Sequence, residues 1–77
     1  MKPTPAQHVA LEVTRDFGGN GEGWAEVELQ FTTRRRIPQY LESATCVAVF
    51  GACERRGWLV IGEGGPSITS DGLAAIR

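Results

Sequence analysis

The sequence predicts a small α+β domain that occupies residues 1–77 as a single unit. Three observations support this prediction. The chain has 77 residues, which is enough for one hydrophobic core and too few for two. Polar and apolar residues alternate in residues 24–33. The helical pattern of residues 37–56 ends in two arginines, and Gly57 follows them. We expect an N-terminal β-hairpin or helix, a central helical segment, a wing-like C-terminal β-hairpin and a short terminal helix.

Residues 4–17 fit two templates. Thr4, Pro5 and Gln7 form the pattern of a helix capping box with proline in the first turn. The apolar residues fit helical spacing as Ala6, Val9, Ala10, Val13 and Phe17, and strand spacing as Val9, Leu11, Val13 and Phe17. The β-branched residues favour the strand. The alternatives differ at Leu11, which points into the core of a hairpin and outward from a helix.

Residues 24–33 predict a half-buried strand. Apolar Ala25, Val27, Leu29 and Phe31 alternate with Glu26, Glu28, Gln30 and Thr32. The glycine-rich connector 18–23 joins this segment to residues 7–17 as an antiparallel hairpin, which is the favoured interpretation. In the alternative, Gly18 ends a helix.

Residues 37–56 predict helical structure, with Pro38 in the first turn. Thr45 is expected to cap a second helix after a short break. Residues 47–50 are apolar on every side of that helix, which is more than so short a chain easily covers, so we expect a homodimer. Gly57 is expected to end the helix in the left-handed conformation, with Trp58 packing back on Cys53.

The C-terminal residues predict a second hairpin. Residues 58–61 form an apolar strand, residues 62–66 a turn and residues 67–69 the returning strand. Ser70 or Asp71 is expected to cap a terminal helix that holds Leu73, Ala74 and Ile76.

Composition argues against several classes of function. The only histidine is His8, and Cys46 and Cys53 are seven residues apart, about 10.5 Å on one helix and too far for a disulfide. These three residues are too few for a structural zinc site. We therefore expect no enzyme activity, no metal and no cofactor. The chain contains no apolar run of about 20 residues and no secretory signal, so we expect no membrane contact and a cytoplasmic location.

The C-terminal half resembles one known superfamily. The segment Glu54-Arg55-Arg56-Gly57-Trp58-Leu59 is similar to the junction between recognition helix and wing in the winged helix-turn-helix superfamily. Residues 68–76, Ile-Thr-Ser-Asp-Gly-Leu-Ala-Ala-Ile, are similar to the strand-to-helix exit of many bacterial members. The resemblance covers residues 37–77. The wing loop departs from the superfamily, because it has no Lys or Arg to enter a minor groove.

The resemblance implies a small DNA-binding regulator or phage-type accessory protein. The helix from Thr45 would lie in the major groove, where Ser43 and Thr45 would contact bases and phosphates. The other residues that it assigns to DNA are arginines, namely Arg34, Arg35, Arg36, Arg55 and Arg56. However, the formal net charge is −1, which does not provide the basic field of a strong nonspecific DNA binder.

The competing hypothesis is a protein-binding module or small inhibitor, such as an anti-defence protein. It would dock on a nucleic-acid-handling complex through its acidic N-terminal half. The residues involved would be Glu12, Asp16, Glu22, Glu26 and Glu28. The position of the five arginines separates the two hypotheses, because one contiguous basic face favours DNA and scattered positions favour protein.

Overall fold

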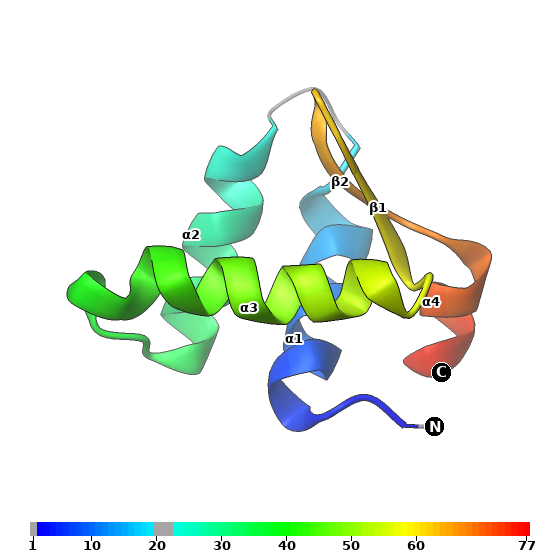
Figure 1. Ribbon diagram of the computed structural model, residues 1–77, viewed down its shortest axis with the longest axis horizontal. Coiled ribbons are helices and arrows are strands. Elements are labelled where there is room, and N and C mark those ends of the chain that lie inside the picture. The colour runs from blue at the N-terminus through cyan, green and yellow to red at the C-terminus, as the bar shows by residue number, and fades with distance from the viewer. Residues whose placement is uncertain (1, 20–22) are drawn as a thin grey trace.

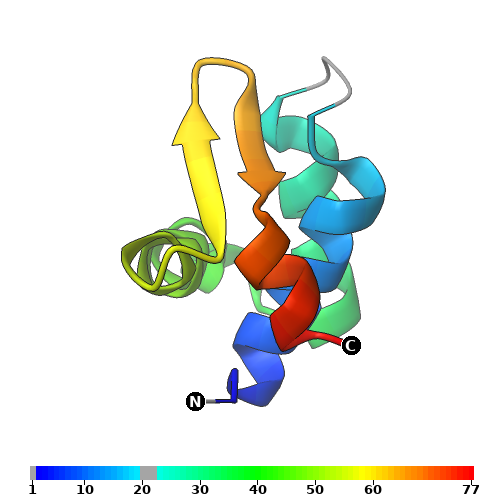
Figure 2. The same ribbon diagram turned by 90° about the vertical axis from the view of Figure 1, so that its right-hand side faces the viewer.

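The computed structural model describes residues 2–19 and 23–77 and confirms the α+β class. The elements in this part of the chain are α1 (Pro5–Phe17), α2 (Trp24–Arg35), the 3-10 helix η1 (Gln39–Leu41), α3 (Glu42–Arg55), β1 (Leu59–Gly62), β2 (Gly65–Ile68) and α4 (Ser70–Ala75). In Figure 1, α3 runs across α1 and α2, and the hairpin rises from its C-terminal end. Figure 2 shows β1 on the side of α3 and β2 on the side of α1 and α2.

The N-terminal hairpin prediction is wrong, and the helical alternative is right for residues 5–17. The capping box forms, because Thr4 Oγ1 accepts from the Gln7 amide at 3.2 Å and the Thr4 amide donates to Gln7 Oε1 at 2.9 Å. The buried Thr14 hydroxyl donates to the Ala10 carbonyl at 2.7 Å, so the helix itself satisfies this polar group. Capping and burial therefore outweigh the small intrinsic preference of β-branched residues for strands.

The position of Leu11 corrects the helical alternative as well. This side chain was expected to point outward from a helix, yet it is 0% exposed. The reason is that α1 lies at the centre of the fold and packs against α2, α3, β2 and α4. A helix enclosed on several sides buries more than one stripe, and here Ala10, Leu11, Val13 and Thr14 are all buried.

The predicted strand at residues 24–33 is also wrong, because these residues form α2. Gly23 allows the sharp entry with its positive φ of 66°. The buried Val27 and Phe31 are four residues apart, a spacing that a helix and a strand both place on one face. Leu29 separates the templates: a strand would bury it beside Val27, whereas it is 56% exposed.

Helix α3 forms without the predicted break. It starts at Glu42 directly after η1, so Thr45 lies inside the helix and caps nothing. Its C-terminal end is as predicted: Gly57 is left-handed with φ 77°, and the Trp58 amide donates to the Cys53 carbonyl at 3.1 Å. The side chains of Cys53 and Trp58 both belong to the core.

The second hairpin is present, and its first strand begins at Leu59, one residue after the predicted start at Trp58. Leu59 pairs with Ile68 and Gly62 with Gly65. The cap of α4 differs from the prediction, because Thr69 precedes Ser70 and performs this role. Its hydroxyl accepts from the Gly72 amide at 3.0 Å and donates to the Gly57 carbonyl at 2.7 Å, which ties α4 to the end of α3.

Candidate functional site

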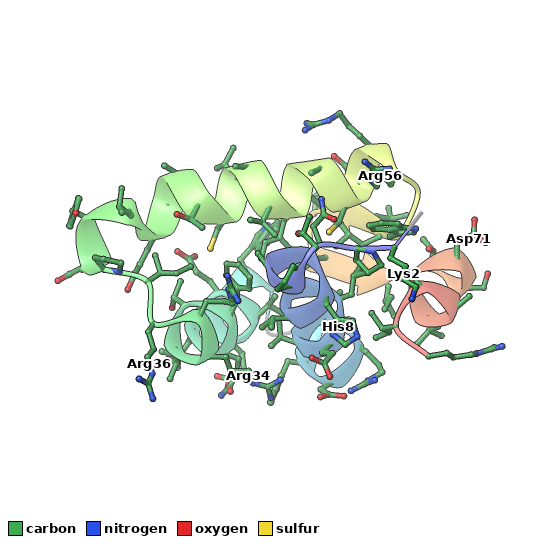
Figure 3. All side chains as sticks on the ribbon, turned by 90° about the horizontal axis from the view of Figure 1, so that it is seen from below. Lys2, His8, Arg34, Arg36, Arg56 and Asp71 are labelled. Carbon is green, nitrogen blue, oxygen red and sulfur yellow. The ribbon has the colours of Figure 1, made fainter. Side chains whose placement is uncertain are left out.

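The five arginines do not form one face. Arg34 and Arg35 end α2 and Arg36 follows with a left-handed φ of 53°, whereas Arg55 and Arg56 lie at the C-terminal end of α3. Helix α3 separates the two groups, and its 14 residues span about 21 Å. Figure 3 shows Arg34 and Arg36 beside α2 and Arg56 at the far end of α3. The contiguous basic face expected of a DNA-binding surface is therefore not formed by these five arginines.

The outer surface of α3 is poor in base-reading groups. Ser43 is exposed, but Thr45 is partly buried, so the structure does not present the two predicted hydroxyls together. The neighbours of Ser43 on the exposed side are Ala44, Val47 and Ala48. Val47 is 73% exposed, which is unusual for a large apolar side chain at the centre of a helix. Such a surface offers apolar contact, whereas reading base edges needs hydrogen-bonding side chains.

The structure also separates the predicted acidic residues. Glu12 and Asp16 lie on α1, where Glu12 Oε1 is 3.2 Å from His8 Nδ1 and Asp16 Oδ1 accepts from Arg15 Nε at 2.9 Å. The hydrogen bond and charge of Arg15 lower the pKa of Asp16. These two carboxylates already have partners on their own helix.

The remaining acidic candidates lie on or before α2. Glu26 accepts from Gln30 Nε2 at 2.9 Å, and Glu22 lies outside the described residues. Glu28 is two residues from Glu26 and therefore points about 200° around the helix from it. Among the members of this set that the structure describes, Glu28 is the one that lines the groove described next.

A groove of about 340 Å³ lies between α2, α3 and β1. Its apolar lining combines aromatic, aliphatic and thiol side chains with a glycine: Trp24, Cys46, Val47, Phe50, Gly51 and Ile61. Its polar lining consists of Ser43, Glu28 and Glu54. This volume is in the range of sites that hold a small ligand or an anchoring side chain.

Aromatic side chains that pack against one another form part of the groove lining. Phe50 packs edge-to-face on Trp24 and on Phe31, with ring centroids 5.2 Å apart in each pair. Phe31 and Phe50 are fully buried, so they fix the position of the partly exposed Trp24 ring. At Gly51, an added Cβ would meet only the flexible end of Arg55, at 3.4 Å. Packing does not demand glycine at this position, and its effect is to leave space in the groove.

Carboxylates give the groove a negative edge. Glu54 Oε2 accepts from the Ile61 amide at 3.3 Å, which holds this carboxylate between α3 and β1. Burial, together with the nearby charges of Glu28 and Glu42, raises the pKa of Cys46 to about 11. Glu28 and Glu54 therefore lie beside the apolar floor of the groove.

The two thiols are packing groups. Both are free and buried, and burial is the main cause that raises the pKa of Cys53 to about 11 as well. At neutral pH each is a protonated thiol, which is a poor nucleophile and a poor metal ligand. Among residues 2–19 and 23–77, no group of three His, Cys, Asp or Glu residues is placed to hold a metal ion.

These thiols predict a loss of stability at high pH. An unfolded cysteine loses its proton near pH 9, whereas in the fold both thiols keep theirs to about pH 11. Between these values the unfolded state binds fewer protons, so rising pH favours unfolding. We expect the free energy of unfolding to fall across this window by roughly 2 kcal/mol for each thiol.

Urea unfolding at a series of pH values measures this effect. The Cys46→Ala/Cys53→Ala variant is the control, because every other titrating group is shared with the wild type. Its free energy of unfolding should fall less steeply between the two pKa values. Equal slopes in both proteins would show that the thiols do not contribute.

Sequence reasoning found Glu28 and Ser43 but missed the rest of the groove. Trp24, Glu54 and Ile61 come from three different elements, and no spacing in the chain relates them. Gly51 was the one available signal, because glycine inside a long apolar helix costs about 1 kcal/mol relative to alanine.

In the described part of the chain, no helix has the length and apolar character needed to cross a bilayer. Comparisons of the chain with protein-family models, curated proteins and solved structures give no match.

Proposed function

We propose that this chain is a small protein-binding module that captures a segment of a partner protein in the groove between α2, α3 and β1. The segment would place an apolar side chain on the floor and lysine or arginine beside it. The observation that carries the proposal is an apolar groove with Val47 exposed at its wall and with Glu28 and Glu54 in its lining. Apolar contact would supply affinity, and charge would supply selectivity.

The order of elements supports the winged helix-turn-helix resemblance as part of this proposal. Three α-helices precede the hairpin, with the short η1 between α2 and α3, and the hairpin follows α3 directly. In such a fold α3 is the helix that faces a partner. Its alanines and Val47 favour a protein surface, and the hairpin turn presents Glu63 where a DNA-binding wing would need a cation. Basic surfaces of nucleic-acid-handling proteins offer segments of the required chemistry.

Peptide titration followed by NMR tests the proposal. The probe is a synthetic peptide with the core Lys-Phe-Arg, and its matched control has the core Glu-Phe-Glu. We expect the basic peptide to shift the Trp24 indole resonance and the amides of Gly51 and Glu54. The acidic peptide should leave them unchanged, because the groove repels its charge. Added salt should weaken the basic peptide's binding.

Two valine variants give a matched control. Val47→Arg places a cation at the groove wall, whereas Val60→Arg changes a valine of similar exposure that lies outside the groove lining. We expect Val47→Arg to weaken binding at least tenfold, since about 1.5 kcal/mol of apolar contact is enough for that factor. Val60→Arg should bind like the wild type. Equal loss in both variants would contradict the groove as the site.

Duplex DNA provides the opposing outcome. If a DNA duplex shifts the resonances of residues 34–36, 43–48 and 55–56 while neither peptide binds, the DNA-binding hypothesis replaces this one. The affinity of the protein for the duplex should then fall with salt at a log–log slope of roughly −0.9 per phosphate contact.

A further inference from the structure

The turn between α2 and α3, residues 36–41, displays the most exposed large apolar side chain in the described chain. Tyr40 is 84% exposed, and it follows Arg34, Arg35 and Arg36 closely in the sequence. The backbone around it is well supported: the Ile37 amide donates to the Thr32 carbonyl at 3.0 Å, and the Leu41 amide donates to the Pro38 carbonyl at 2.9 Å. The turn therefore presents Tyr40 on a hydrogen-bonded backbone, shortly after three arginines in the sequence.

This is the chemistry that the groove is proposed to select. We infer that residues 34–41 of a second copy of the chain occupy the groove, so that the free protein self-associates through its own binding site. The inference rests on the proposed function. The tyrosine ring matches the apolar floor, and the arginines match the charges of Glu28 and Glu54.

The spacing along α3 allows the contact to be reciprocal. Ala44, Val47 and Gly51 lie three and four residues apart on one side of α3, and Tyr40 comes just before this helix, in η1. If two copies of α3 pack antiparallel about a two-fold axis, the turn that holds Tyr40 in each copy lies beside the C-terminal half of α3 in the other, where Gly51 and Glu54 line the groove. Each chain then gives one tyrosine and receives one, and the assembly closes as a dimer.

The small residues explain how the two helices would approach. Ala44, Ala48 and Gly51 are small residues near Val47, and the flexible end of Arg55, 3.4 Å from where a Cβ of Gly51 would lie, has to move aside for an aromatic ring to pack there. Self-association and partner binding would compete for the same groove. The apparent affinity for a partner should therefore fall as the concentration of this protein rises.

Sedimentation velocity over a range of protein concentrations tests the inference, with Lys-Phe-Arg peptide titration on the same samples. We expect the wild type to be a dimer that dissociates on dilution. Tyr40→Ala should weaken the dimer at least tenfold and still bind the peptide, because Tyr40 lies outside the groove lining. Val47→Arg should lose both dimer and peptide binding, whereas Val60→Arg should keep both.

The outcomes separate this inference from the proposed function. A wild type that stays monomeric at every concentration while binding the peptide would overturn the self-association alone. A dimer that Tyr40→Ala leaves intact would also overturn it, because another surface would then hold the copies together. A monomeric Tyr40→Ala protein that fails to bind the peptide would overturn the proposed function and leave the dimer contact standing.

Discussion

Leu11→Asp should unfold this protein or bring it close to unfolding. The leucine is 0% exposed at the centre of the core, and the substitution places a carboxylate there, while Arg15, four residues further on, is exposed and already bonded to Asp16. Burying an unpaired charge costs several kcal/mol, while a domain of this size has only about 4–11 kcal/mol of stability. Thermal unfolding followed by circular dichroism measures the loss.

Leu29→Asp is the matched control. This leucine is 56% exposed on α2, so its substitution should change the free energy of unfolding by no more than about 1 kcal/mol. The pair discriminates between the two folds of the N-terminal half. Paired strands would bury both leucines on one inner face and make both variants unstable. Two severely destabilised variants would therefore argue against α1 and α2.

The N-terminal half shows why pattern alone chose the wrong element. Val27 and Phe31 are four residues apart, and that interval fits a helix and a strand equally well. Thr4, Pro5 and Gln7 were the local signal that identified the correct structure of residues 5–17, because their chemistry depends on a helix start and has no counterpart in a strand. The burial of Leu11 could not be predicted, since it requires four other elements to surround α1.

The C-terminal half was easier to predict, because its signals are local. Gly57 must take a left-handed conformation after Arg56, and the glycine-rich turn at residues 62–65 leaves little alternative to a hairpin. The candidate site was harder. The groove joins Trp24, Gly51 and Ile61 from three elements, and the separation of the two arginine groups depends on the full length of α3. Both are properties of packing and not of any short sequence segment.

Gly72→Ala should strongly destabilise the packing of α4 against the start of the C-terminal hairpin. Gly72 lies inside α4, where alanine is intrinsically favoured over glycine by about 1 kcal/mol. Packing reverses this preference, because an added Cβ would overlap the Trp58 carbonyl oxygen and lie 2.8 Å from Ile68 Cγ1. The same carbonyl accepts a hydrogen bond from the Thr69 amide at 3.0 Å. The methyl group would therefore push α4 away from the residues that anchor it.

We expect Gly72→Ala to lower the free energy of unfolding by about 3 kcal/mol, as overpacking against rigid backbone does. Chemical denaturation measures the loss, and hydrogen exchange should show faster exchange in α4. Gly51→Ala is the helical control: its Cβ meets only the flexible end of Arg55, so the variant should gain up to about 1 kcal/mol. Gly64→Ala, with open space around it, should be close to neutral. If Gly72→Ala proved as stabilising as Gly51→Ala, α4 could not be docked against Trp58, and the hairpin would lose its support from the C-terminal helix.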